Sequence, residues 1–344
     1  MPALLEATEE LRPVARILDD ALARVRQRLD EQLESDLPPV RSLCAHVERY
    51  RGKMLRPSVV VLSGLAADPR SPGGVRPEMV TEAHVTVGAV CELVHMATLV
   101  HDDVLDEAGT RRGGPTVNEL RGNEAAVILG DYLIASAFHL CSGLESTSAA
   151  RLIGSVSMTT CSGELLQLHH RDDFSLDEAT YFEIVGRKTA SLIGAAAELG
   201  AGYAGGSEGV CTALGDAGRL LGVAFQIQDD VLDLTGVERI VGKSLGKDLE
   251  KGKLTLPLIH HLESLSPSGR GEALALLEEA CQRGSGDAGR RAVAALETTG
   301  SIRYARRAAE DLIRRAKTLL ATLPATPARR YLLWLADTVV SRTR

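Results

Sequence analysis

The sequence predicts an all-α protein, and three observations support that prediction. Apolar residues recur every three or four positions through most of the 344 residues, which is the helical period. Aromatic residues make up only 3% of a chain rich in Ala, Leu, Val and Arg, a composition that favours helices packed through small aliphatic side chains. No run with the alternating period of a strand competes. We therefore expect roughly a dozen helices in one domain over residues 1–344.

The helices are expected in ranges separated by stretches rich in Gly, Pro, Ser or charge. Pro57, in the basic turn GKMLRP at 52–57, indicates an early helix start, and the segment 190–202, apolar on nearly all sides, is expected at the centre of the bundle. The breaks fall at 67–77, 107–116, 170–175, 203–209, 234–253 and 266–271. The periodic ranges, in order, are 14–34, 79–101, 123–143, 149–169, 178–203, 210–233, 254–264, 271–283, 289–298, 301–322 and 328–342.

Composition and charge exclude several classes of function. A formal net charge of −7 argues against a nucleic-acid-binding surface. Six scattered cysteines without a C-x-x-C pair indicate neither a zinc site nor a disulfide framework, and fit a reducing cytoplasm. The N-terminus does not resemble a signal peptide, and no run of about 18 apolar residues indicates a membrane span.

The pentapeptide DDVLD occurs twice, at Asp102–Asp106 and at Asp229–Asp233, each time after an apolar helical stretch. Positions i and i+4 share a helix face, so each copy presents a cluster of carboxylates. Their mutual repulsion raises a pKa unless a hard cation binds them, and oxygen-only ligands of this kind suit Mg²⁺. A solvated face, or an acidic complement to a helix N-terminus, is the alternative for one copy, but repetition favours metal. A histidine–aspartate metal pair at His101–Asp102 is a further alternative, for which the other histidines supply no convincing set.

Basic residues accompany both clusters, as expected if metal ions bridge the carboxylates to phosphate. Lys53 and Arg56 lie in GKMLRP, and Arg111 and Arg112 follow the first cluster by a short loop. The run GKSLGKDLEKGK at 242–253 follows the second, although Lys247 and Lys251 there fit a solvated surface equally well. This charge suffices for two diphosphates, one held through Mg²⁺ and one held directly by Arg and Lys. Two diphosphate esters in an apolar bundle indicate prenyl chain elongation.

Six blocks in order make the chain resemble the trans-prenyl diphosphate synthase family over essentially its whole length: GKMLRP, HMATLVHDDVLDEAGTRRGGPTVN, GELLQL, GRKTASLI, FQIQDDVLDL and GKSLGKDLEKGKLTLP. The resemblance implies the isoprenoid synthase fold, a helical bundle around a central cavity. It also implies three Mg²⁺ ions on an allylic diphosphate, bound by Asp102, Asp103, Asp106, Asp229, Asp230 and Asp233.

Further roles follow from the resemblance alone. The diphosphate of isopentenyl diphosphate is expected on Lys53, Arg56, His95 and Arg112, and the allylic diphosphate on Arg111, Lys188, Lys243 and Lys253. The developing allylic cation is expected to face Thr189, Gln226 and the Lys188 carbonyl, with Gln167 near the reacting carbon and Asp248 behind the metal ligands. Without the resemblance, His95, Thr189 and Gln167 would be interpreted as core polar residues.

Product length in such enzymes depends on the helix that precedes the first cluster. Short-chain members tend to carry an aromatic residue four or five positions before the first aspartate, where this chain has Thr98 and Ala97. Val94, Cys91, Val90 and Val87 continue an unblocked run, and each helical turn of about 5.4 Å accommodates roughly one isoprene unit. Phe138 is a candidate floor of the tunnel, or equally a core residue. We expect a long all-trans product of about seven to ten units.

Three alternatives remain open on the sequence: a geranylgeranyl or farnesyl diphosphate synthase, a non-catalytic subunit of a heteromeric synthase, and a class I terpene cyclase. The intact aspartates argue against the second, and DDVLD in place of an N-x-x-x-S/T-x-x-x-E motif argues against the third. The resemblance also implies a homodimer. A cytoplasmic location is expected, with association at a membrane surface left open.

Overall fold

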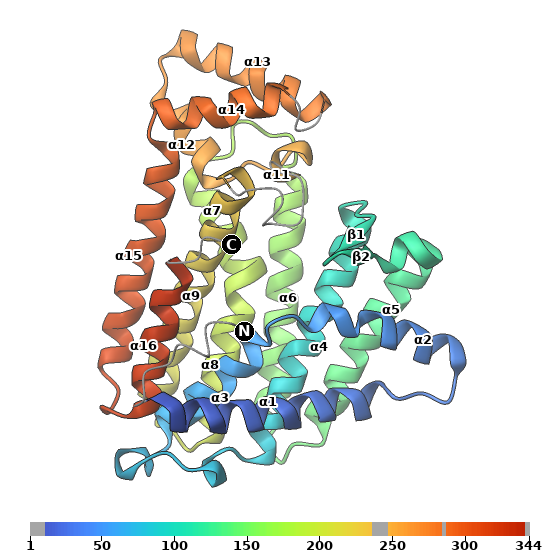
Figure 1. The fold of residues 1–344 in the computed structure, drawn as a ribbon, viewed down its shortest axis with the longest axis vertical. Helices are drawn as coiled ribbons and strands as arrows, with labels where there is room; N and C mark the ends of the chain where they lie inside the picture. Colours follow the sequence, from blue (N-terminus) through green and yellow to red (C-terminus); the bar gives the residue numbers. More distant parts are fainter. Residues whose placement is uncertain (1–10, 236–246, 284–286, 341–344) are drawn as a thin grey trace. The chain divides into compact units, whose positions relative to one another are not determined.

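A computed structural model describes residues 11–235, 247–283 and 287–340, and these residues are overwhelmingly helical (Figure 1). The predicted all-α class is confirmed. The helices of the first half are α1 (Arg12–Leu33), α2 (Pro38–Val47), α3 (Leu55–Ala67), α4 (Glu82–Leu105), α5 (Val117–Ser142) and α6 (Ser148–His169). Those of the second half are α7 (Glu178–Val185), α8 (Ser191–Tyr203), α9 (Glu208–Thr235), α11 (Lys247–Glu250), α12 (Leu256–Ser264), α13 (Pro267–Arg283), α14 (Asp287–Thr298), α15 (Ser301–Ala321) and α16 (Pro327–Val340).

Several short elements lie between these helices. Single 3₁₀ turns occur as η3 (Glu48–Arg51), η4 (Ser71–Gly73) and η5 (Pro77–Met79), and a π-helical turn, η6 (Gly186–Ala190), joins α7 to α8. Strands β1 (Thr110–Arg111) and β2 (Gly114–Pro115) pair antiparallel as a hairpin inside the predicted break at 107–116. The strand period could not show this hairpin, because two residues a strand are too few to alternate.

The chain forms two compact units, each assembled from separate stretches of sequence. The first comprises 1–157, 192–218 and 318–334, and the second 158–191, 219–317 and 335–344. The expectation of one domain around a central cavity stays a prediction.

Helix α4 is the core of the first unit and packs against α1, α3 and α5. It begins with a capping box, in which the Thr81 side chain accepts from the backbone of His84 and the His84 ring accepts from the backbone N–H of Thr81. The other ring nitrogen of His84 lies 3.0 Å from the carbonyl oxygen of Gly200 in α8. Because α4 has apolar residues on all sides, it can be buried along most of its length.

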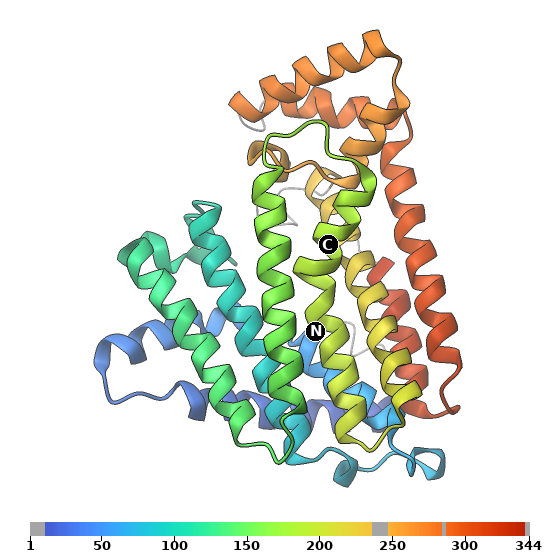
Figure 2. The ribbon, with the colours of Figure 1, turned by 180° about the vertical axis from the view of Figure 1, so that it is seen from behind.

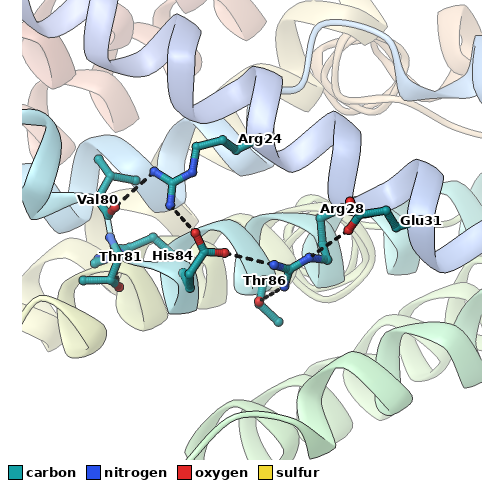
Figure 3. A network of polar contacts seen from close by, with 8 residues as sticks. Arg24, Arg28, Glu31, Val80, Thr81, His84 and Thr86 are labelled. Atoms are coloured by element: carbon teal, nitrogen blue, oxygen red, sulfur yellow. Dashed lines mark hydrogen bonds and ion pairs between the residues drawn. The ribbon is translucent and has the colours of Figure 1, made fainter.

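Arginines of α1 attach that helix to the start of α4 (Figure 3). Arg24 donates to the Val80 carbonyl oxygen over 3.2 Å and to Glu82 over 2.6 Å, and Arg28 donates to Glu82 over 2.9 Å and to Thr86 over 2.7 Å. The two guanidinium groups lower the pKa of Glu82, chiefly through the hydrogen bond from Arg24. Acidic Glu82 lies in the first turn of α4, where it also complements the helix dipole.

Close backbone contact between α3 and α8 depends on Gly200. A Cβ atom at this position would lie 2.1 Å from the Val60 carbonyl oxygen. We expect Gly200→Ala to cost about 3 kcal/mol or more of unfolding free energy, because rigid backbone must move to make room. Gly202→Ala is the matched control: nothing lies within 4 Å of its Cβ position, so the better helix propensity of Ala should stabilise by up to about 1 kcal/mol. Urea denaturation measures both, and equal midpoints would contradict the tight packing.

In the second unit, helices α12–α15 follow one another closely along the chain. Helices α13 and α14 lie side by side, as both ribbon views show (Figures 1 and 2). Tyr304 of α15 stacks on the His260 ring with centroids 4.0 Å apart, and its hydroxyl donates to Glu178 of α7 over 2.7 Å. These contacts connect the C-terminal helices of the unit to α7.

Helices α4, α5 and α9 are long and apolar enough to cross a membrane, judged on length and composition alone. Polar residues interrupt each of these helices, so none contains an unbroken run of about 18 apolar residues. In α4, 78% of the apolar window is buried inside the protein, compared with 39% in α5 and 44% in α9. The apolarity of α4 is thus accounted for by the core.

Candidate active site

The first aspartate cluster lies at the C-terminal end of α4. Asp102 and Asp103 are in its last turn, and Asp106 follows as the C-cap, its N–H bonded to the Asp102 carbonyl oxygen over 2.8 Å. Partial negative charge from the helix dipole accumulates at this end, so acidic side chains are unfavourable here. The alternative that the acids complement a helix N-terminus is therefore wrong for this copy.

Within this cluster the three carboxylates differ in exposure. Asp102 and Asp106 are half-buried, whereas Asp103 is only 1% exposed. The Tyr50 hydroxyl donates to Oδ2 of Asp103 over 2.8 Å. Arg111 of β1 donates to Oδ1 through Nε, over 2.8 Å, and through Nη2, over 2.7 Å. Arg111, predicted as a ligand of the allylic diphosphate, is thus bound to Asp103 in this structure, with its guanidinium 5.7 Å from the Tyr50 ring centroid.

Beside this cluster, His101 does not form the metal pair considered as an alternative. Its Nε2 lies 3.2 Å from the Val127 carbonyl oxygen and 3.6 Å from Oδ1 of Asp131, both in α5. Among the described residues, no group of three or more His, Cys, Asp or Glu side chains is arranged to hold a metal ion.

A basic set of residues surrounds the N-terminus of α3. Lys53 is exposed in the turn before the helix, and Arg56 lies in the first helical turn, where no side chain caps the backbone. Arg112, one residue after Arg111, lies so close to Gly52 that a Cβ there would clash with its guanidinium group. Uncapped N–H groups and neighbouring cations make a helix N-terminus suitable for an anion.

Buried polar atoms around this basic set lack hydrogen-bond partners in the part of the chain that the structure describes: Nε of Arg56, Nε and Nη2 of Arg51, and Oε2 of Glu92. Met54 and Arg112 also adopt left-handed backbone conformations, with φ of 54° and 49°. Unsatisfied donors and strained non-glycine residues are both costly, and they concentrate at binding sites. An anion with several acceptor oxygens would satisfy the unpaired nitrogen donors of Arg51 and Arg56.

His95 and Glu92, one helical turn apart on α4, both lie in the field of these arginines. Burial, and then the charges of Arg56 and Arg112, lower the pKa of His95 well below its ordinary value, so its ring is neutral and can donate one hydrogen bond. Burial raises the pKa of Glu92 to about 7, against the opposing effect of Arg56. The sequence did not identify Glu92 as a site residue, because a single acidic residue within an apolar helix belongs to no recognisable motif.

Glu92 makes stability depend on pH in a predictable direction. Its ordinary pKa is 4.5, so between about pH 4.5 and 7 the folded state holds a proton that the unfolded state has released. The free energy of unfolding therefore falls as pH rises from 4.5 through 7. The total loss is about 3 kcal/mol. We expect Glu92→Gln to remove this loss. Urea midpoints at pH 5 and pH 8 measure the effect, with exposed Glu124→Gln as the control; an unchanged pH dependence in Glu92→Gln would contradict it.

The second cluster lies in the last two turns of α9, as the helix is described to Thr235. Asp229 is half-buried, whereas Asp230 and Asp233 are 4% and 2% exposed. Burial, followed by the charge of Asp248, raises the pKa of Asp230 to about 7. The predicted supporting residue Asp248 does meet this cluster, because its backbone N–H donates to Oδ2 of Asp233 over 3.3 Å.

A chain of hydrogen bonds leads to Asp230 from other elements of the second unit. The Tyr181 hydroxyl of α7 donates to Oδ2 over 2.6 Å, and the Gln226 amide donates to Oδ1 over 2.8 Å. Gln226 in turn accepts from the Thr189 hydroxyl over 3.1 Å. The structure thus connects Thr189 and Gln226 to the second cluster, while their expected place beside the allylic cation stays a prediction. Tyr181 was not predicted.

Lys188 lies in the π-helical turn η6. Its Nζ donates to Oε1 of Gln167 over 2.9 Å and forms an ion pair with Glu164, both on α6. The backbones of α6 and η6 approach closely at Gly163, where a Cβ would lie 2.7 Å from the Lys188 nitrogen. Glu164 was missed, although it lies in the block GELLQL. Single π turns often occur at functional sites.

For the remaining predicted positions, the structure gives mainly the burial of the side chain. Lys253 is half-buried after α11, and Lys243 lies outside the described residues, as does most of the 234–253 segment. Ala97 is fully buried, and Thr98 donates to the His95 carbonyl oxygen over 2.8 Å. Phe138 on α5 is 40% exposed in the single chain. The roles assigned to Ala97, Thr98 and Phe138 stay predictions.

Comparison with known proteins decides the family. The family model described as polyprenyl synthetase matches residues 38–292, which include both aspartate clusters and the basic residues of the candidate site. The chain belongs to the polyprenyl synthetase family. This confirms the predicted resemblance, and with it the prediction of an enzyme that transfers prenyl groups.

Relatives in this family cover nearly the whole chain. It is 35% identical over 324 residues to octaprenyl diphosphate synthase of Escherichia coli strain K12, covering 94% of this chain and 96% of that protein. It is 36% identical over 299 residues to geranylgeranyl diphosphate synthase of Methanosarcina mazei, covering 85% and 86%. The crystal structure of polyprenyl synthase from Caulobacter crescentus, complexed with calcium and isoprenyl diphosphate, is 34% identical and superposes with a TM-score of 0.87 over 97% of this chain and 98% of that one.

Proposed function

We propose that this polyprenyl synthetase condenses isopentenyl diphosphate with an allylic diphosphate, farnesyl or geranylgeranyl diphosphate, to form a long all-trans polyprenyl diphosphate of about seven to ten isoprene units. The observation that carries the proposal is the placement of three aspartates at the unfavourable C-terminal end of α4 and three in the last turns of α9. Acids in such positions are explained by a cation that they bind.

Mg²⁺ fits the chemistry of these residues. The donors are carboxylate oxygens only, and Mg²⁺ usually takes one or two carboxylates and completes its shell with water and substrate phosphate. It therefore does not require the preformed group of three ligands that is absent from the described residues. We assign up to three ions to Asp102, Asp103, Asp106, Asp229, Asp230 and Asp233. When bound, Mg²⁺ neutralises the charge that develops on departing diphosphate.

The basic set at the N-terminus of α3 is proposed to hold the diphosphate of isopentenyl diphosphate. The unsatisfied Nε of Arg56 and the uncapped helix start support an oxyanion there, together with Lys53 and Arg112. Neutral His95 contributes a hydrogen bond without adding charge.

The allylic diphosphate is proposed to bind Arg111, Lys188, Lys243 and Lys253. In the structure Arg111 and Lys188 are paired with carboxylates, so diphosphate would compete with Asp103 and Glu164 for these cations. The Thr189 hydroxyl and the amides of Gln226 and Gln167 are oxygen dipoles suited to the allylic cation. The isopentenyl double bond attacks this cation, and a proton then passes to the departed diphosphate.

A long product is supported by the lack of an aromatic plug on α4. Ala97 and Thr98 occupy the positions where short-chain enzymes tend to be blocked. Octaprenyl diphosphate synthase of Escherichia coli is a long-chain relative, although geranylgeranyl diphosphate synthase of Methanosarcina mazei is equally similar in sequence. A geranylgeranyl diphosphate synthase is therefore the second candidate.

One experiment tests this function. Pure protein is incubated with Mg²⁺, labelled isopentenyl diphosphate and farnesyl diphosphate, and the dephosphorylated products are sized by reverse-phase chromatography. We expect products of about seven to ten units, in keeping with the absence of a block within several turns of α4. Products that stop at four units would refute the long-chain assignment. No turnover by the protein alone, with turnover restored by a partner chain, would indicate a subunit of a heteromeric synthase.

A homodimer is also proposed, on the exposed apolar residues of α5. Val127, Ile128 and Phe138 are 41%, 67% and 40% exposed, and residues 127 and 138 lie on one face of the helix. Sedimentation of the pure protein at micromolar concentration tests this state, and a persistent monomer would refute it.

The proposed location is the cytoplasm. All six cysteines lie in the described part of the chain, and none forms a disulfide, as a reducing compartment requires. We propose that α4, whose apolar window is largely buried in the core, does not span a membrane, and that contact with a membrane surface is limited to delivery of the product.

A further inference from the structure

The two aspartate clusters share a feature that the repeat of DDVLD does not reveal. In each, the middle aspartate is almost completely buried: Asp103 is 1% exposed and Asp230 is 4% exposed. Each receives a hydrogen bond from a buried tyrosine hydroxyl, Tyr50 in the first unit and Tyr181 in the second. The tyrosines are 53 and 49 residues away in sequence, so the same contact is built twice from unrelated segments.

Both oxygens of each middle carboxylate are engaged. On Asp103, Oδ2 accepts from Tyr50 and Oδ1 from the guanidinium of Arg111. On Asp230, Oδ2 accepts from Tyr181 and Oδ1 from the Gln226 amide. A buried carboxylate held at both oxygens has one rotamer available, which fixes the rotation of the helix end that carries it.

The first aspartate of each cluster is placed differently. Asp102 and Asp229, which immediately precede the middle residues, are both half-buried and reach solvent. Because successive helical positions differ by about 100°, fixing the middle residue also sets the direction in which its neighbour points. Groups that orient metal ligands in this way commonly change metal affinity by about ten- to a hundredfold when removed.

We propose that Tyr50 and Tyr181 are positioning residues. Each anchors the middle aspartate of its cluster inside the protein, and so aims the half-buried carboxylates beside it at the metal–diphosphate ligand. Asp103 and Asp230, together with Asp233, which is 2% exposed and accepts from the Asp248 backbone, then serve as anchors, with Asp102, Asp106 and Asp229 as the ligands. This inference rests on the proposed function, and it divides the six carboxylates of that proposal between two roles.

The test replaces each tyrosine by Phe and measures Mn²⁺ binding in the presence of inorganic pyrophosphate, by the loss of the free Mn²⁺ paramagnetic resonance signal. We expect Tyr50→Phe and Tyr181→Phe to weaken Mn²⁺ binding by about tenfold. In turnover assays the Mg²⁺ concentration for half-maximal rate should rise by a similar factor, while kcat at saturating Mg²⁺ changes little. Weaker metal affinity with preserved kcat is a pattern that a purely structural role would not produce.

Two control variants also lose a tyrosine hydroxyl, but at positions away from the aspartate clusters. Tyr304→Phe removes a tyrosine–carboxylate hydrogen bond to Glu178 in the second unit. Tyr331→Phe, in the first unit, removes a buried hydroxyl that has no hydrogen-bond partner in the described chain. Both should bind Mn²⁺ as the parent does. Melting temperatures of all four variants show whether each remains folded under the assay conditions.

A double substitution shows whether Tyr181 acts through Asp230. Tyr181→Phe should weaken Mn²⁺ binding in the parent and have no further effect in an Asp230→Ala background. Parent-like affinity in both tyrosine variants, or equal weakening in the controls, would overturn the inference. A parent that binds Mn²⁺ with pyrophosphate but makes no prenyl product would overturn the proposed function instead, and the comparison of tyrosine variants would still stand.

Discussion

Asp102→Ala and Asp229→Ala are each expected to lower kcat by about a thousandfold or more, because each would remove a carboxylate that we propose binds the cation neutralising the leaving group. The fold should survive, since both side chains are half-buried and neither is in the core. Incorporation of labelled isopentenyl diphosphate measures turnover, and circular dichroism measures folding.

Stability should change in the opposite direction from activity. Asp102 adds negative charge to the negative end of α4, so its removal should stabilise the metal-free protein by about 0.3–1 kcal/mol. Asp20→Ala, an exposed substitution in α1, is the control and should leave turnover unchanged. Near-normal turnover in Asp102→Ala or Asp229→Ala would refute the metal assignment.

Thr98→Phe and Ala97→Phe are expected to shorten the product to about four or five units, because an aromatic ring one turn before the first aspartate would block a growing chain. Thr98 is half-buried and should accept the ring more easily. Ala97 is fully buried, so overpacking there should also cost about 1–3 kcal/mol of stability. Chromatography of the dephosphorylated products gives the chain lengths.

Leu99→Phe provides the control for product length. It adds an aromatic ring to the same half-buried stretch of α4, rotated by about 100° from position 98. It should leave the product distribution as in the parent. If Thr98→Phe and Ala97→Phe also make the parental products, the growing chain does not pass this face of α4.

Periodicity located most helices but not their ends. The range 79–101 was expected where α4 runs from Glu82 to Leu105, because the apolar pattern stops at the aspartates although the backbone continues in helical form. Helices α2 and α3 were absent from the predicted ranges, apart from the start indicated at Pro57. The π turn η6 inside the predicted helix 178–203 has no periodic signature, since one extra residue in a turn barely alters the pattern.

The sequence offered candidate site residues where charged residues gather in a recognisable block, as at DDVLD and GKMLRP. The structure also shows that Thr189 donates to Gln226 and Lys188 donates to Gln167, two contacts that the sequence did not predict. Tyr50, Tyr181 and Glu92 were missed for a physical reason. Each is an isolated residue whose role depends on a partner brought close by tertiary packing, and linear sequence does not show such distances.

The placement of acids at the end of α4 also has an evolutionary consequence. Because these residues oppose the helix dipole, substitutions that neutralise them would be favoured by selection for stability alone. A gene copy released from selection for turnover would therefore be expected to lose its aspartates early and to gain stability as it did so. An intact cluster at the end of α4 is therefore expected where selection for turnover outweighs this gain in stability.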